Sequence, residues 1–226
     1  MATLYVVATP IGNLADITVR ALDTLKEVDL IVCEDTRHSR RLLDHYGIRK
    51  PVISGHSHNE ARSAEKVIVH LQSGENVAYV TDAGTPGVSD PGRVLVQTVR
   101  DAGFRTVPIP GASALAAILS VSGFPGRSVS FDGFLSPKPG KRRNQLAELL
   151  NGKKNFILYE SPHRILKLMR DLADLDSERP VLLGRELTKV HEELLDGPAA
   201  EVLTELENRT TIKGEIVLLV GMTKKG

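Results

Sequence analysis

Short apolar runs rich in β-branched residues alternate along this chain with amphipathic segments of about 10–15 residues, and this alternation restricts the fold more than any other feature. Strands separated by helices of that length form βαβ units, whose parallel strands are covered on both faces. In the first half we expect strands at 4–8, 29–34, 76–82 and 105–110, and helices at 18–28, around 40–46, at 59–71 and at 93–102. Gly47 is predicted to stop the second helix, and Asn59 to cap the third.

The second half has more hairpin character. We expect strands at 131–135, 155–160, 179–187 and 214–221, a strand or hairpin arm at 191–197, and helices at 141–150, 162–175 and 198–208. The small, apolar segment 111–123 is compatible with a helix that connects the halves. The sequence thus predicts an α/β protein of two lobes, 1–115 and 116–226, with a mainly parallel first sheet, a mixed second sheet and a ligand cleft between the lobes.

Composition excludes several classes of protein. The 226 residues carry 29 Lys and Arg against 28 Asp and Glu, so RNA could be bound only through local patches rather than by bulk charge. A single cysteine excludes an internal disulfide and a thiolate zinc cluster. No apolar run approaches the roughly 20 residues of a membrane span, and no basic segment precedes the first apolar run. We therefore expect a cytoplasmic protein without a signal peptide or membrane contact.

Common catalytic motifs are missing. The loop after the first strand reads TPIGN, which is not a dinucleotide fingerprint, and no Walker A sequence is present. The pair His56 and His58 lacks a carboxylate at metal-site spacing, so we expect a loop and no metal. Ser113 follows a strand in GASAL, but the second glycine of a nucleophile elbow is absent, and we expect a helix start there.

Chemistry is instead predicted at the carboxyl ends of the strands, where open α/β sheets bind ligands. In the first lobe these loops are TPIGN (9–13), EDTR (34–37), VTDAGTPGVSDPG (80–92) and PGAS (110–113). They are rich in small residues and suit a nucleoside better than a triphosphate. EDTR has two equal interpretations, a ligand contact or a helix cap made by Asp35 or Thr36. In the second lobe YESPHR and GRELTK place paired charges after strands.

Together, TPIGNL, EDTR, DAGTPGVSDPG, PGAS, GFLSPK, YESPHR and RELTK resemble one family over residues 4–221. It is the bacterial ribosomal RNA small subunit methyltransferase I family, a tetrapyrrole-methylase-like group of class III S-adenosylmethionine enzymes that methylates the 2′-hydroxyl of a cytidine. The resemblance implies a homodimer that acts on the small ribosomal subunit or its rRNA, with S-adenosylmethionine in the cleft between the lobes.

The resemblance also implies which residues contact the cofactor. The glycine-rich GxGPG and GDP motifs of tetrapyrrole C-methylases are replaced here by TPIGN and Gly84-Thr85-Pro86, which disfavours a porphyrinoid substrate. The predicted cofactor residues are Pro10, Gly12, Asp82, Gly84, Thr85, Pro86, Ser113, Ala114, Tyr159, Gly214, Glu215 and Ile216. Some members of the family continue into a C-terminal helical extension, whereas this sequence stops at Gly226; we expect substrate docking to rely on the two lobes and the dimer.

Methyl transfer to a hydroxyl is a direct displacement and needs no covalent enzyme intermediate. Glu34, Glu160 and Glu186 are the candidate bases, which the sequence does not rank. Arg185, Lys189 and Arg37 are expected to stabilise negative charge or bind phosphates. Two basic clusters are expected either to hold RNA or to be solvated helix faces: Arg37, Arg40 and Arg41, and Lys138, Lys141, Arg142 and Arg143.

Three other functions remain open from the residues. The chain could methylate a protein or a small molecule. It could be a non-catalytic RNA-binding module of ribosome assembly. It could also be a hydrolase that uses Ser113.

Overall fold

A computed structural model describes residues 2–55 and 60–222, and it forms two compact units whose boundary lies between Ser113 and Ala114. The predicted cap Asn59 and the pair His56 and His58 lie outside the described residues. The first unit contains a five-stranded, wholly parallel sheet in the order β3-β2-β4-β1-β5. Its strands are β1 (Thr3–Val7), β2 (Leu30–Cys33), β3 (Val52–Ser54), β4 (Val77–Val80) and β5 (Arg105–Ile109).

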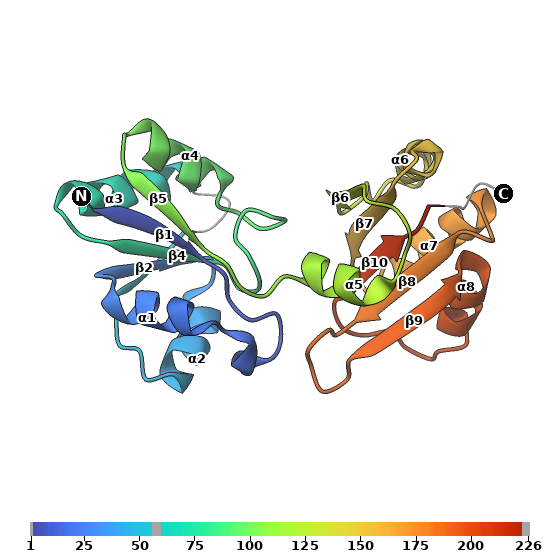
Figure 1. The fold of residues 1–226 in the computed structure, drawn as a ribbon, viewed down its shortest axis with the longest axis horizontal. Coiled ribbons are helices and arrows are strands. Elements are labelled where there is room, and N and C mark those ends of the chain that lie inside the picture. The colour runs from blue at the N-terminus through green and yellow to red at the C-terminus, as the bar shows by residue number, and fades with distance from the viewer. Residues whose placement is uncertain (1, 56–59, 223–226) are drawn as a thin grey trace. The chain divides into compact units, whose positions relative to one another are not determined.

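Four α-helices cover this sheet on its two faces (Figure 1). They are α1 (Val19–Glu27), α2 (Thr36–His45), α3 (Glu60–Gln72) and α4 (Arg93–Asp101), and a 3₁₀ turn, η1 (Leu14–Asp16), precedes α1. Alternate residues of β4 separate the two faces, because successive side chains of a strand point to opposite sides. Val77 and Tyr79 pack with α3 and α4, while Ala78 and Val80 pack with α1 and α2. The predicted parallel sheet of the first lobe is confirmed.

Local sequence explains most of the helix ends. The Asp35 side chain accepts a hydrogen bond from the Arg37 backbone N–H at 2.8 Å, so Asp35 is the N-cap of α2. Gly47, with φ of +66°, ends the same helix, and the Ile48 N–H bonds back to the Leu43 carbonyl. The short strand β3 was not expected from the sequence, because its three residues are too few to show a periodic pattern.

The second unit contains a mixed five-stranded sheet in the order β6-β7-β10-β8-β9, as predicted. Only the β6–β7 pair is parallel; the β7–β10, β10–β8 and β8–β9 pairs are antiparallel. The strands are β6 (Val129–Gly133), β7 (Asn155–Glu160), β8 (Pro180–Arg185), β9 (Glu193–Pro198) and β10 (Ile216–Val220). The helices are α5 (Ala114–Ser122), α6 (Pro139–Asn151), α7 (Ile165–Leu175) and α8 (Ala199–Glu207).

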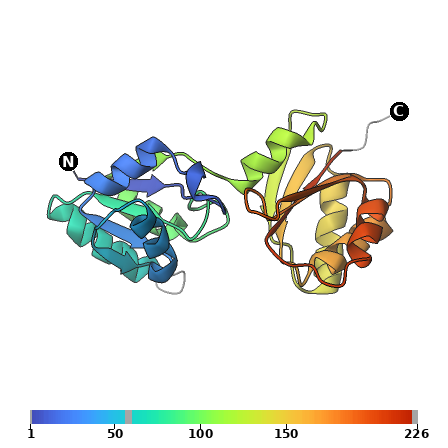
Figure 2. The ribbon, with the colours of Figure 1, turned by 90° about the horizontal axis from the view of Figure 1, so that it is seen from below.

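Helix α5 packs on one face of this sheet through Ile118, and α6, α7 and α8 pack on the other (Figure 2). The main core therefore lies on the three-helix side, where Phe156, Leu158 and Leu218 are buried. Helix α7 begins at Ile165 rather than at residue 162 as expected. The reason is a turn in which the Arg164 and Ile165 N–H groups both bond to the Ser161 carbonyl.

The α3–α4 contact contains a cap between two helices. Gly92, the N-cap of α4, has no side chain, and the Glu60 carboxylate takes its place. Its Oε1 accepts from the backbone N–H groups of Gly92, Val94 and Leu95 at 2.7, 2.9 and 3.2 Å. A carboxylate at a helix N-terminus also interacts favourably with the helix dipole.

We predict that Glu60→Ala lowers the free energy of unfolding by about 1–2 kcal/mol, because three N–H groups at the start of α4 lose their acceptor. Urea denaturation followed by circular dichroism measures the change. Glu65→Ala is the matched control, since Glu65 is exposed on the same helix. Equal stability of the two variants would contradict the capping role.

Candidate active site

A backbone bridge joins the first and third of the predicted ligand loops in the first unit. The Thr9 N–H donates to the Gly84 carbonyl at 2.9 Å, and the Gly84 N–H donates to the Thr9 carbonyl at 3.1 Å. The Thr9 hydroxyl also donates to the Thr81 carbonyl at 3.2 Å. Gly84 has φ of +79°, and a Cβ there would lie 3.3 Å from the Ile11 side chain. The bridge therefore requires glycine at position 84.

Two further bonds connect the remaining loops of this unit. Asp82 Oδ1 accepts from the Asp35 N–H at 3.1 Å, which links the loop after β4 to the start of α2. The Thr85 hydroxyl donates to the Ala112 carbonyl at 3.2 Å, next to Ser113. The four strand-end loops are thus held together by side-chain and backbone hydrogen bonds, and they bring Asp82, Gly84 and Thr85 close to one another.

The other predicted residues of the first unit differ in exposure. Pro10 and Pro86 are buried, Gly12 is exposed, and Ser113 is half-buried. Glu34 follows β2 and is also half-buried. Burial raises the pKa of the nearby Tyr79 hydroxyl, and the negative charges of Glu60, Glu34 and Asp90 raise it further. Glu34 therefore belongs to an acidic part of this unit.

In the second unit, predicted catalytic residues and predicted cofactor residues meet at one end of the sheet. Ile216, the first residue of β10, is paired with Glu160 at the end of β7 on one side and with Arg185 at the end of β8 on the other. Tyr159 is paired with Val217, one residue further along. Ala114 is the first residue of α5 and lies in this unit as well.

Glu186, Lys189 and Glu215 form a charged group beside this end of the sheet. Lys189 Nζ contacts Glu186 Oε1 at 2.8 Å and Glu215 Oε2 at 3.1 Å. The Glu186 N–H donates to the Glu215 carbonyl at 2.9 Å, and Glu186 Oε1 accepts from the Glu215 N–H at 2.9 Å. The hydrogen bond from Lys189 lowers the pKa of Glu186, which stays a carboxylate.

The backbone around this group is unusual. Glu186 and Thr188 have φ of +52° and +68°, a region that residues other than glycine seldom occupy and that is costly for a β-branched residue. Gly214 has φ of +94°, and a Cβ there would overlap the Glu186 side chain, 2.6 Å from its Oε1. The position of Glu186 therefore depends on Gly214.

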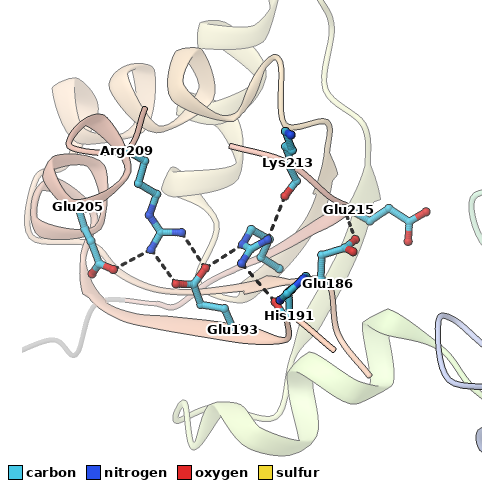
Figure 3. Close-up of polar contacts among 8 residues, drawn as sticks. Glu186, His191, Glu193, Glu205, Arg209, Lys213 and Glu215 are labelled. Atoms are coloured by element: carbon cyan, nitrogen blue, oxygen red, sulfur yellow. Dashed lines mark hydrogen bonds and ion pairs between the residues drawn. The ribbon is translucent and has the colours of Figure 1, made fainter. Parts of the chain in front are cut away.

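Arg185 is engaged in a network that the sequence did not reveal; Figure 3 labels its partners Glu193, His191 and Lys213. Its Nε contacts Glu193 Oε2 at 2.8 Å, and its two terminal nitrogens donate to the Lys213 and His191 carbonyls, each at 3.2 Å. Arg209 contacts both Glu193 oxygens, at 2.7 and 2.8 Å, and Glu205 at 2.8 Å. Arg185 thus ties β8 to β9 and to the segment before β10.

Glu160 occupies a different environment from Glu186. Its side chain is 1% exposed, its Oε1 accepts from the Ser161 N–H at 2.8 Å, and its Oε2 lies 3.1 Å from Arg164. Burial raises its pKa, while the Ser161 N–H and the Arg164 charge oppose the shift. The Arg164 guanidinium also donates to the Leu135 carbonyl at 2.7 Å. Glu160 is therefore part of a buried ion pair.

The two basic clusters are only partly available for RNA. Arg142 was expected to contact RNA or solvent, but its side chain is 5% exposed and pairs with Asp171 at 2.7 Å. Arg143 pairs with Asp174 at 3.2 Å. Arg37 is well exposed and pairs with Asp35 at 2.8 Å. Lys138 and Lys141 are exposed and make no ion pair within residues 2–55 and 60–222.

A cavity of about 360 Å³ lies between α4 and the β1–β5 side of the first sheet. Among the predicted cofactor residues only Pro86 lines it, beside Gly87 and side chains of α4 and β5. The cavity therefore adjoins the loop after β4, but neither Thr9 nor Gly84 lines it. Among the described residues there is no group of three or more His, Cys, Asp or Glu that could hold a metal, and no helix long and apolar enough to cross a membrane.

Comparison with known proteins identifies the family. The model of the tetrapyrrole (corrin/porphyrin) methylases matches residues 3–203. A protein of Xylella fastidiosa named ribosomal RNA small subunit methyltransferase I is 49% identical, over 96% of this chain and 81% of that protein. Proteins with the same name from Neisseria meningitidis and Vibrio cholerae are 47% and 48% identical, over 96% of this chain and 75% and 76% of theirs. The chain belongs to this methyltransferase family.

Solved structures agree with the family's fold. Uroporphyrin-III-C-methyltransferase from Thermus thermophilus superposes with a TM-score of 0.70 at 20% identity, over 98% of this chain and 94% of that one. Cobalt precorrin-4 methyltransferase gives 0.71 at 16% identity, over 97% and 94%. The predicted tetrapyrrole-methylase-like architecture of two α/β sheets is therefore confirmed.

Glu193 makes stability depend on pH. The hydrogen bonds from Arg209 and Arg185 lower its pKa from 4.5 to about 2 against the opposing effect of burial. Because the folded-state pKa lies below the unfolded value, its contribution to stability is complete above pH 4.5 and is lost as the pH falls towards 2.

We predict that Glu193→Gln lowers the urea midpoint at pH 7 and that the difference from wild type shrinks between pH 4.5 and 2.5. Urea denaturation at several pH values measures it. Glu192→Gln is the neighbouring control. A difference that stays constant across this range would show that Glu193 does not titrate with folding.

Proposed function

We propose that this chain transfers a methyl group from S-adenosylmethionine to the 2′-hydroxyl of a cytidine in small-subunit ribosomal RNA. The supporting observation is its near half identity, over almost the whole chain, to proteins named ribosomal RNA small subunit methyltransferase I. Membership of a methyltransferase family makes transfer of a methyl group the reaction class. The cytidine ribose as acceptor follows from the family resemblance of the motifs.

The residues of the first unit fit the proposed cofactor. Thr81 is buried among the bridged loops, and its hydroxyl has no hydrogen-bond partner in the part of the chain that the structure describes. Asp82 uses Oδ1 for the Asp35 N–H, which leaves Oδ2 for a ligand amine or hydroxyl. Gly84 and Gly111 leave no room for side chains beside Ile11 and Ala8. We propose that Pro10, Gly12, Asp82, Gly84, Thr85, Pro86 and Ser113 hold the cofactor from this unit.

From the second unit we propose Ala114, Tyr159, Gly214, Glu215 and Ile216 as cofactor contacts. The sulfonium of the bound cofactor supplies an activated methyl group, which the acceptor oxygen takes as the carbon–sulfur bond breaks. Alignment of the two reactants contributes most of the acceleration, since good positioning is worth about 7–11 kcal/mol. The bonded loops serve this purpose because their geometry is fixed before the ligand binds.

The charged group of the second unit is proposed to assist at the acceptor hydroxyl. Burial disfavours the charge of Lys189, but its bonds to Glu186 and Glu215 raise its pKa overall, so it remains a cation. A fixed cation stabilises the negative charge that develops on an attacking oxygen. Glu186 holds Lys189 in place, and its other oxygen can accept the hydroxyl proton. Glu160 is enclosed with Arg164, and we propose that it positions the end of β7 instead.

Substitutions separate these roles. We predict that Glu186→Gln and Lys189→Met each lower the single-turnover rate by about 10²–10⁴-fold. Folded Glu160→Gln should keep a rate within a few-fold of wild type while its thermal midpoint falls. Glu34→Gln tests the remaining candidate base. A wild-type rate for Glu186→Gln would exclude a catalytic part for this carboxylate.

The acceptor is tested by offering labelled S-adenosylmethionine together with unmodified small ribosomal subunits, free rRNA or a porphyrinogen. We predict incorporation into RNA alone, with the label on a cytidine 2′-oxygen after nuclease digestion. Label in a porphyrinogen would favour a tetrapyrrole acceptor. RNA binding without any incorporation would favour a non-catalytic assembly module.

We further propose that the protein acts as a homodimer in the cytoplasm, where ribosomal subunits are assembled. This part of the proposal rests on the family resemblance of the motifs.

A further inference from the structure

Phe134 is the one exposed aromatic residue of the chain. Its five Phe and four Tyr all lie in the described part of the chain, and the other eight are buried or half-buried. Phe134 is 56% exposed and directly follows β6. Burying an aromatic ring is strongly favourable, so an aromatic ring held in solvent next to a candidate active site suggests a binding surface.

The ring of Phe134 is supported from one side. Tyr159 lies between two phenylalanines, with ring centroids 4.8 Å from Phe131 and 6.0 Å from Phe134, in edge-to-face geometry with interplanar angles of 65° and 71°. Such contacts orient a ring and leave its outer surface open. The three aromatic residues come from the ends of β6 and β7, where Tyr159 neighbours the Glu160–Ile216 pair.

A β-bulge produces this arrangement. In a regular strand, residues three apart in the sequence point to opposite faces. The β6–β7 register shifts between Phe131 and Gly133, which leaves Asp132 as the extra residue, and Gly133 has φ of +61°. Phe131 and Phe134 can therefore both contact Tyr159. Bulges commonly redirect a side chain next to a functional site.

Positive charge lies just beyond the aromatic residues in the sequence. Lys138 and Lys141, at the start of α6, are exposed and have no ion-pair partner among the described residues. In the same segment Arg142 and Arg143 form ion pairs with Asp171 and Asp174, respectively. An exposed aromatic ring followed within a few residues by unpaired lysines supplies the two elements that bind single-stranded nucleic acid, base stacking and phosphate contacts.

We propose that Phe134, supported by Tyr159, is the surface on which a base of the RNA substrate stacks, with Lys138 and Lys141 contacting the adjoining phosphates. This inference rests on the proposed function and extends it to a contact that binds the RNA substrate. Stacking accepts any base, so Phe134 contributes affinity and placement of an unpaired nucleotide rather than recognition of its sequence.

The test compares three substitutions of Phe134 with one control. Phe134→Ala should weaken binding to unmodified small subunits by about ten- to a hundredfold. Phe134→Trp should retain binding, and Phe134→Leu, which is apolar but cannot stack, should resemble alanine. Val121→Ala is the control, because Val121 is also 56% exposed and lies in the same unit. S-adenosylmethionine affinity by calorimetry should stay unchanged in all four.

A second readout reports contact directly. Ultraviolet irradiation of the wild-type complex, followed by digestion and mass spectrometry, should yield a nucleotide attached to the peptide that contains Phe134. Lys141→Gln should lower the slope of log affinity against log salt by roughly one, as expected for loss of one phosphate contact.

Three outcomes would overturn the proposal: wild-type binding by Phe134→Leu, no cross-link at Phe134, or a smaller particle mass for Phe134→Ala in light scattering. The last would mean that Phe134 joins two copies of the chain. If wild type methylates RNA but Phe134→Ala binds it normally, only this inference fails. If wild type methylates no RNA at all, the proposed function fails first.

Discussion

The paired hydrogen bonds between Thr9 and Gly84 fix the shape of the strand-end loops in the first unit. In a parallel sheet the carboxyl ends of the strands leave their last polar groups at one edge, and these groups must find partners. Here the loop after β1 and the loop after β4 satisfy each other. The loops after β2 and β5 then attach to this pair through Asp82 and Thr85. The result is a preorganised polar surface made largely of backbone, which suits a ligand with little net charge.

The second unit differs from the first because its charged residues cluster at the edge of an apolar sheet. Most of them are used to hold the structure together. Arg185 and Arg209 share Glu193, and Glu160 is enclosed with Arg164. Removing one partner of such a pair leaves the other charge without a counter-charge. The stability lost in this way is larger than the net contribution of the intact pair. The Glu186–Lys189 pair is about as exposed as the pairs of Glu193, but the strained backbone at Glu186 distinguishes it from this framework.

The sequence predicts the architecture well because the architecture follows from local patterns. The alternating pattern predicted nine of the strands, and Gly47 predicted the end of α2, whereas the cap made by Asp35 is one of two interpretations that the residue types left open. The strand β3 escaped detection because it is too short. The structural roles of Arg185 and Glu160 could not be predicted from local sequence. Arg185 shares the distant partner Glu193 with Arg209, and Glu160 is buried beside Arg164. Phe134 lies in the motif GFLSPK, but its exposure depends on a β-bulge that the sequence pattern does not show.

Gly214 has a consequence for how genetic variation in this protein should be interpreted. The residue carries no functional group, yet the space its missing side chain leaves is filled by Glu186. A missense change at this codon would push that carboxylate aside and disturb the lysine bound to it. Its phenotype would imitate a substitution of Glu186, although the altered amino acid has no chemistry of its own.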